Sequence, residues 1–210
     1  MTAKFITLEG MDGAGKSTHI PTIIEMLQAR GCEVVSTREP GGTLLGERLR
    51  ELLLHEAMHA ETETLLMFAA RREHIANVIA PALKRGAYVL SDRFTDATYA
   101  YQSGAKGVSA KKVEILEQWV QETLQPDVTL LFDVPVEVSV ARLAGARSPD
   151  KFERESADFF TKIRNAYLLR ASQNPERFRV IDASKPLQEV AEIVKKVIRS
   201  EEHTSELQSP

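Results

Sequence analysis

The sequence predicts a doubly wound α/β fold, in which helices cover both faces of a five-stranded parallel sheet. Two patterns favour this fold: short apolar runs alternate with longer helical patterns, and the apolar runs are nearly continuous. Continuous apolar runs are typical of parallel strands buried on both faces, and strand–helix repetition gives right-handed crossovers. A length of 210 residues with 43% hydrophobic residues suits one domain with a substantial core.

Each element follows from this alternation. We expect strands at Lys4–Glu9, Glu33–Thr37, Tyr88–Ser91, Val128–Asp133 and Arg179–Ile181. We expect helices at 16–30, 43–55, 61–84, 109–124, 136–144, 155–173 and 187–198. Gly31 and Gly86 stand where a helix ends and a strand begins, as C-terminal caps do. Ligands of such sheets bind at the carboxyl ends of the strands, so polar residues after each strand are the candidates for function.

The first expected strand leads into a glycine-rich segment, Gly10–Ser17, with the sequence G-M-D-G-A-G-K-S. This is the P-loop pattern, whose backbone N–H groups hold the phosphates of a nucleoside triphosphate. Lys16 can reach the β- and γ-phosphates, and Ser17 can coordinate Mg²⁺. Asp12 is unusual, because it places a carboxylate where phosphate-binding loops avoid negative charge. The predicted triphosphate contacts are Gly10, Met11, Asp12, Gly13, Ala14, Gly15, Lys16, Ser17 and Thr18.

Charged residues also follow other expected strands, at the same rim as the P-loop. Asp92 comes directly after the third strand, where an acid can hold Mg²⁺ opposite Ser17. Arg93 follows it, and phosphoryl transfer needs positive charge around the transferring group. Arg38 and Arg50 are candidates to hold the phosphate of an acceptor, because guanidinium groups bind phosphate with two hydrogen bonds. A solvated helix face is the other interpretation of Arg50.

The helical segment 61–84 has an apolar residue one turn before each of two arginines. Met67 precedes Arg71, and Phe68 precedes Arg72. Such a pair can stack a base and bond its edge. A core stripe with flanking charges is an equally good interpretation of this spacing.

Residues 142–154 lie between two helical patterns and are rich in small and charged residues. A plain loop is one interpretation of this segment. The other is a small mobile lid that lays Arg142 or Arg147 over the triphosphate and excludes water.

Composition argues against several other classes of protein. A net charge of −3 gives no sign of bulk binding to nucleic acid or to membranes. The single cysteine, Cys32, cannot form an intrachain disulfide, which fits a reducing cytoplasm. We find no signal-like N-terminal segment and no apolar run approaching about 18 residues. We therefore expect a cytoplasmic protein without a membrane-spanning helix.

Five motifs point to a known family. They are L-E-G-M-D-G-A-G-K-S, T-R-E-P-G-G-T, M-F-A-A-R, S-D-R-F-T-D-A-T-Y-A-Y-Q-S-G and P-D-V-T-L-L-F-D-V-P. With them the chain resembles bacterial thymidylate kinase (dTMP kinase) from Met1 to about Ile198. T-R-E-P-G-G together with D-R-F and A-Y-Q separates it from adenylate, guanylate and cytidylate kinases. The resemblance implies one P-loop kinase domain over 1–198 with a lid. It also implies a homodimer that converts ATP and dTMP, with Mg²⁺, to ADP and dTDP.

The resemblance also implies roles for individual residues. Asp12 matches the acid that faces the sugar of the monophosphate and helps to orient the acceptor. The implied catalytic residues are Asp12, Lys16, Arg93 and Arg147. The implied dTMP contacts are Asp12, Arg38, Arg50, Met67, Phe68, Arg71, Arg93, Thr98 and Gln102. Arg142 joins the P-loop in binding ATP, and Ser17 and Asp92 hold Mg²⁺.

The chain departs from the pattern of many family members at two places, and at a third it follows the bacterial type. Many members have phenylalanine where this chain has Met67, so either Met67 or Phe68 can pack on the thymine. Lys151 stands where arginine is usual, which leaves the lid charge to Lys151 or Arg147. Because no arginine follows Asp12, the lid has to supply that charge, as in the bacterial type.

The last residues, 199–210, do not look like the rest of the chain. The polar run Arg199–Ser209 breaks the apolar helix that we expect to end at Ile198. These eleven residues also resemble the translation of a common sequencing-adapter oligonucleotide. We therefore predict that 199–210 is a non-native tail; an ordinary polar tail is the alternative.

The same residues allow two functions other than a dTMP kinase. A kinase for another deoxynucleotide or for a nucleoside stays open, although Gln102 and Arg71 fit the carbonyls and N3–H of thymine. A nucleotide-dependent switch protein is disfavoured. Such a protein needs switch loops that face a partner, whereas this rim carries a second phosphate site.

Overall fold

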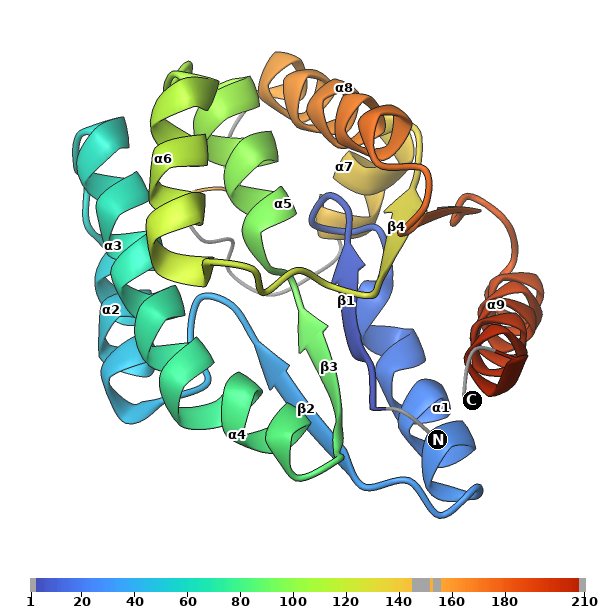
Figure 1. Cartoon of the computed structure of the whole chain (residues 1–210). Helices are drawn as coiled ribbons and strands as arrows, with labels where there is room; N and C mark the ends of the chain where they lie inside the picture. Colours follow the sequence, from blue (N-terminus) through green and yellow to red (C-terminus); the bar gives the residue numbers. More distant parts are fainter. Residues whose placement is uncertain (1–2, 145–151, 153–155, 208–210) are drawn as a thin grey trace.

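The structure is a computed structural model, and it describes residues 3–144, Phe152 and residues 156–207. Its centre is a five-stranded sheet with the order β2-β3-β1-β4-β5 (Figure 1). The strands are β1 (Phe5–Glu9), β2 (Val34–Arg38), β3 (Tyr88–Asp92), β4 (Val128–Asp133) and β5 (Phe178–Asp182). Every neighbouring pair is parallel, which confirms the predicted α/β sheet.

Helices cover both faces of this sheet. The α-helices are α1 (Lys16–Gln28), α2 (Leu44–His55), α3 (Ala60–His74), α4 (Ala80–Lys84), α5 (Thr95–Thr98), α6 (Ala110–Gln121), α7 (Val136–Ala144), α8 (Ala157–Gln173) and α9 (Leu187–Leu207). Two π-helical turns, η1 (Ile75–Ile79) and η2 (Tyr99–Ala105), follow α3 and α5. Helices α1 and α9 contact each other on one side of the sheet, and α3 to α6 lie with α8 on the other (Figure 1).

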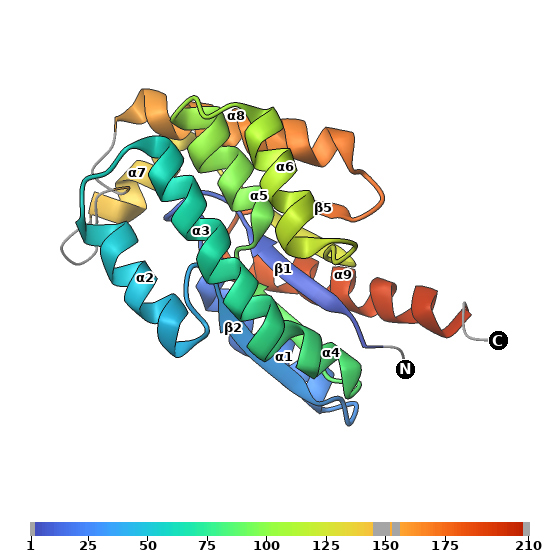
Figure 2. The same cartoon turned by 60° about the vertical axis from the view of Figure 1, so that its left-hand side comes forward.

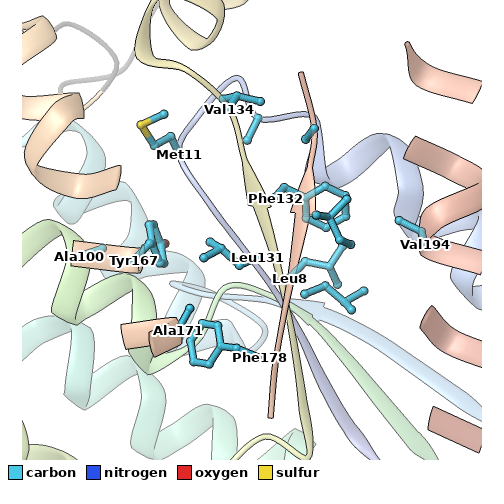
Figure 3. Close-up of a cluster of buried hydrophobic side chains, with 14 of the residues drawn as sticks. Leu8, Met11, Ala100, Leu131, Phe132, Val134, Tyr167, Ala171, Phe178 and Val194 are labelled. Atoms are coloured by element: carbon cyan, nitrogen blue, oxygen red, sulfur yellow. The ribbon is translucent and has the colours of Figure 1, made fainter. Parts of the chain in front are cut away.

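The core shows why the strands lack an alternating pattern. Leu131 and Phe132 are consecutive in β4 and point to opposite faces of the sheet (Figure 3). Tyr167 of α8 lies on the side of Leu131, and Val194 of α9 lies on the side of Phe132. A strand buried on both faces needs apolar residues at every position. The result is a rigid platform whose carboxyl edge carries the polar residues.

The structure has helical turns over residues 95–105, where the sequence predicted none. This segment contains β-branched and small polar residues with weak helix propensity and no apolar stripe. Tertiary contacts override that weak propensity, because η2 packs closely against α8. A Cβ atom on Gly104 would lie 2.5 Å from the Cβ of Ala166, so only glycine allows this approach.

Two other expected helices differ from the structure. The single helix expected at 61–84 is divided by η1, and Pro81 at the start of α4 lacks the N–H that would continue α-helical bonding. The expected end at Ile198 is wrong, since α9 continues to Leu207. Glu201 holds the added turn, because its carboxylate pairs with Arg179 at 2.6 Å and its main-chain oxygen accepts from Lys4 at 2.6 Å. That the tail is non-native stays a prediction.

Candidate active site

A cavity opens beside the P-loop at the carboxyl edge of the sheet. Its walls come from the P-loop, the turn after β2, helices α2 and α3, and the segment that follows β3. The sequence-predicted residues that line it are Asp12, Arg50, Met67, Arg71, Arg93, Thr98 and Gln102. These residues are scattered along the chain, and the parallel topology brings them to one place.

The P-loop has a backbone that few residues other than glycine could adopt. Gly10, Gly13 and Gly15 have φ angles of 136°, 77° and 86°. A Cβ atom on Gly10 would lie 2.4 Å from the carbonyl oxygen of Phe132, and one on Gly13 would lie 2.7 Å from that of Ser139. The loop is therefore fitted tightly onto β4 and α7, ahead of the N-terminus of α1.

The side chain of Lys16 folds back onto the P-loop. Its Nζ donates to the carbonyl oxygens of Gly10 and Met11, each at 3.0 Å. Burial and the neighbouring Arg93 lower the pKa of Lys16 to about 8. Arg142 of α7 lies on the outside of the loop and donates to the carbonyl oxygen of Gly13 at 3.3 Å. The other predicted lid residues, Arg147 and Lys151, lie outside the described residues.

Asp12 forms an ion pair with Arg93 at the wall of the cavity. The Arg93 Nη2 atom lies 2.6 Å from Asp12 Oδ1, and Tyr101 donates to Asp12 Oδ2 at 2.7 Å. Burial alone would raise the pKa of Asp12, but Arg93 and Lys16 outweigh it and lower the pKa to about 2. The carboxylate that looked misplaced in an anion-binding loop is thus ionised and held by a cation.

Arg93 is held by a hydrogen-bonded pair, Glu9 and Tyr167. The sequence did not indicate a role in the site for either of these two residues. Glu9 accepts hydrogen bonds from the backbone N–H of Phe94 and from the Tyr167 hydroxyl, both at 2.7 Å. That hydroxyl accepts a bond from Arg93 Nη1 at 2.9 Å. These contacts hold Arg93 at a φ of 71°, in the left-handed region that residues other than glycine rarely adopt. A charged residue directly before the P-loop was the one available signal for Glu9.

Replacing Glu9 with glutamine is expected to make stability less sensitive to rising pH. Burial and the nearby Asp96 raise the pKa of Glu9 from 4.5 to about 8 in the folded protein. Its favourable contribution is therefore full below the unfolded pKa and is lost as the pH rises through the folded one. Thermal unfolding would be measured for the variant and the wild type. The Tm of the variant minus that of the wild type should increase between about pH 5 and about pH 8. A difference that stays constant with pH would contradict this, and Glu192→Gln on exposed α9 is the control.

Arg71 forms the far end of the cavity and is almost completely buried. Its Nε donates to Glu39 Oε2 at 2.7 Å, and its Nη2 donates to the Thr98 hydroxyl at 3.1 Å. His74 Nδ1 lies 2.8 Å from the other oxygen of Glu39, which fixes that carboxylate in turn. Arg71 Nη1 is buried and finds no hydrogen-bond partner in the described part of the chain. A buried donor at a cavity wall is suited to a polar ligand.

Met67 and Phe68 have different surroundings. Met67 lines the cavity, whereas Phe68 does not and packs in the core with Phe5 and Phe94. The guanidinium carbon of Arg71 lies 4.6 Å from the centre of the Phe68 ring. Phe68 therefore contacts Arg71 and does not line this cavity, and its contact with the base stays a prediction.

The two arginines near β2 also differ. Arg50 lines the cavity and donates to the carbonyl oxygen of Pro40 at 2.9 Å. Arg38 does not line it, because its guanidinium turns to Glu47 at 2.8 Å on an exposed surface. It borders a neighbouring hollow that Asp92 shares.

Asp92 and Ser17 occupy the donor side of the rim. Asp92 Oδ1 is buried and has no hydrogen-bond partner among the residues that the structure describes. Its charge acts on Lys16, whose pKa it raises against the effect of burial. Ser17, which follows Lys16 in the chain, is exposed at the start of α1. A buried carboxylate oxygen without a donor suits a cation.

A P-loop that faces an arginine-lined cavity on the same rim defines a P-loop phosphotransferase for a small acceptor. The chain belongs to the thymidylate kinase family, whose sequence profile matches residues 8–194. It is 69% identical over 199 residues to the thymidylate kinase of Methylobacillus flagellatus, covering 95% of this chain and 98% of that one. It is 62% identical over 200 residues to that of Cupriavidus taiwanensis, covering 94% and 98%. The crystal structure of thymidylate kinase from Ehrlichia chaffeensis is similar with a TM-score of 0.77 and 32% identity, over 94% of this chain and 99% of that one.

Proposed function

We propose that the chain transfers the γ-phosphoryl group of ATP to dTMP, giving ADP and dTDP for dTTP synthesis. The observation that carries this proposal is the ion pair between Asp12 and Arg93. Asp12 belongs to the P-loop, and both residues line the cavity beside it, so donor and acceptor would meet at this pair. Membership of the thymidylate kinase family supports dTMP as the acceptor.

A panel of nucleoside monophosphates tests this function. The purified protein would be incubated with ATP, Mg²⁺ and each monophosphate in turn, and the diphosphate product separated by ion-exchange chromatography. dTMP is expected to be converted fastest. Absence of turnover with every monophosphate would overturn the proposal, and faster turnover of another one would change the substrate.

On the donor side, the P-loop amides and Lys16 would bind the ATP phosphates, with Arg142 close to the loop. Ser17 and Asp92 would hold Mg²⁺, and the unpartnered buried oxygen of Asp92 fits that cation. When bound, this cation would supply positive charge that offsets the negative charge of the phosphates during transfer. Arg147 of the lid is proposed to add positive charge, although it lies outside the described residues.

On the acceptor side, Arg50 and Arg93 would bind the phosphate of dTMP, and Arg38 would join them by exchanging Glu47 for that phosphate. Asp12 would orient the sugar. Met67 would pack on the thymine, since it lines the cavity. Thr98, Gln102 and Arg71 would surround the polar edge of the base.

Replacing Arg71 with alanine is expected to weaken dTMP binding and to leave ATP binding nearly unchanged. The lost charged hydrogen bonds should raise the KM for dTMP by about 10- to 100-fold. The KM for ATP should stay within about threefold, because Arg71 lies at the far end of the cavity from the P-loop. Steady-state kinetics with each substrate varied would measure both constants. An equal rise in the two would contradict the assignment, and Arg85→Ala at an exposed ion pair is the control.

We also propose a homodimer that forms through α3 and α6, which contact each other side by side (Figures 1 and 2). Trp119 and Leu65 line a shared hollow on this face and are 77% and 56% exposed. Exposed apolar residues gathered in this way favour a protein interface. Sedimentation equilibrium should give twice the 23.4 kDa chain mass. Trp119→Glu should give the monomer mass, whereas Leu187→Glu on α9 should not; a monomeric wild type would contradict the dimer.

Two observations bear on the location of the protein. No helix in the described ranges is both long and apolar enough to cross a membrane. Cys32 is a half-buried free thiol, which suits a reducing compartment. We propose the cytoplasm.

A further inference from the structure

Glu63 is a fully buried carboxylate on α3 that the proposed mechanism does not use. It accepts a hydrogen bond from the Gln102 side-chain amide at 2.8 Å. It also pairs with Lys106, whose Nζ lies 2.8 and 2.9 Å from its two oxygens. A buried carboxylate is costly unless it is paired and hydrogen-bonded, so this arrangement demands a reason beyond packing.

The contact with Glu63 decides which end of the Gln102 amide faces the cavity. An ionised carboxylate can only accept hydrogen bonds, so the Nε2 donor of Gln102 must be the atom that faces it. The Oε1 acceptor is then left for the other side, and Gln102 lines the acceptor cavity. No group in the described part of the chain donates a hydrogen bond to this oxygen.

The orientation depends on an acceptor-only carboxylate, and the ion pair with Lys106 at 2.8 Å favours that form of Glu63. The Lys106 ammonium group neutralises the carboxylate and lies 4.5 Å from the centre of the Phe152 ring. Phe152 lines the same cavity. The Glu63 side chain is 1% exposed and that of Lys106 is 20% exposed, so the carboxylate is shielded from water and the ammonium group is partly shielded.

We propose that Glu63 is a positioning residue that sets base specificity through Gln102. By holding the amide in one orientation, it presents only a hydrogen-bond acceptor to the base. Thymine and uracil carry an N–H at position 3 and match that acceptor. Cytosine carries a lone pair at N3 and would meet the oxygen with repulsion. This inference rests on the proposed function, because it assumes that the base of the acceptor lies against Gln102.

The test replaces Glu63 with glutamine, which keeps the shape and can both donate and accept. Gln102 is then free to turn either atom towards the base. We expect the KM for dTMP to rise by about tenfold. The inhibition constant of dCMP, measured against dTMP as substrate, should fall. The ratio of this inhibition constant to the KM for dTMP should therefore drop by more than about tenfold. kcat with saturating dTMP should change by less than about threefold, because the reacting phosphates lie elsewhere.

Two controls separate orientation from general damage. Glu61→Gln alters a carboxylate two residues away on α3, which pairs with Lys112 at the surface, and should leave the ratio unchanged. Glu63→Asp keeps an acceptor-only group and should keep discrimination against dCMP, even if both constants weaken. If Glu63→Asp loses discrimination, the inference is overturned, and this holds whether or not Glu63→Gln folds. Circular dichroism and Tm would establish folding.

A double-mutant cycle shows whether Glu63 acts through Gln102. If it does, the Glu63→Gln, Gln102→Ala double variant should have the same ratio as Gln102→Ala alone. Effects that multiply would overturn the inference. Suppose that the wild type phosphorylates dTMP and that folded Glu63→Gln has an unchanged ratio. This result would overturn the role of Glu63 and leave the proposed function intact. A wild type without dTMP turnover would overturn both.

Discussion

Replacing Lys16 with alanine is expected to reduce dTDP formation by at least about a thousandfold. The Lys16 ammonium lies inside the P-loop, bonded to the carbonyl oxygens of Gly10 and Met11. From there it can move onto phosphate oxygens as charge develops on them, and a buried cation acts more strongly than one in water. Initial rates of dTDP formation at saturating substrates would measure the loss.

The matched control for this prediction is Lys162→Ala, which removes a lysine from an exposed ion pair with Asp158 on α8. It should leave the rate unchanged. Activity of Lys16→Ala within tenfold of the wild type would show that the loop lysine does not contribute to the transfer step. Calorimetric titration with ATP would separate a loss of donor binding from a loss of transfer.

Replacing Asp12 with asparagine is expected to lower kcat by about a hundredfold, with the KM for ATP within about threefold of the wild type. The substitution keeps the shape of the side chain but removes the charge that pairs with Arg93 at 2.6 Å. It also offers an amide N–H to the Tyr101 hydroxyl, which now donates to Asp12. Arg93 would lose its ion pair, and the acceptor sugar would lose the carboxylate that orients it. The loop amides that bind ATP would stay in place.

Steady-state kinetics would measure both constants for this variant, with Asp158→Asn as a control of the same chemistry at an exposed site. A parallel loss of turnover and ATP affinity would show that Asp12 acts on the donor side. The low pKa of Asp12, about 2, adds a further condition. Between pH 6 and pH 8 Asp12 is already ionised, so the pH profile of the wild type should owe nothing to it in that range.

The sequence predicted the sheet well because the central strands β1, β3 and β4 are nearly continuous buried runs. The P-loop could be recognised because its function depends on a contiguous backbone. Prediction failed where residues act through distant partners. Glu9 bonds Tyr167 across 158 positions, and Glu63 bonds Gln102 across 39. No local pattern distinguishes such a carboxylate from one on a solvated surface.

The two arginines near β2 show the same limit. Arg38 and Arg50 are equally plausible phosphate ligands in the sequence, yet only Arg50 lines the cavity, while Glu47 engages Arg38. The turns over 95–105 were missed because their polar residues are buried by neighbours, not arranged in a stripe. Thr98 and Gln102 could be placed in the site only through the resemblance, not through periodicity.

The hydroxyl of Tyr167 links Arg93 and Glu9, two residues that lie far apart in the sequence. It receives a hydrogen bond from Arg93, 74 positions away, and gives one to Glu9, 158 positions away. Phenylalanine at this position would leave both partners short of a bond in a buried site, at about 1–3 kcal/mol for each unsatisfied group. Variation among related sequences should therefore be correlated here. Arg93 is held by its proposed role at the acceptor phosphate, so a change at Tyr167 is expected to accompany a change at Glu9, and these two positions should vary together.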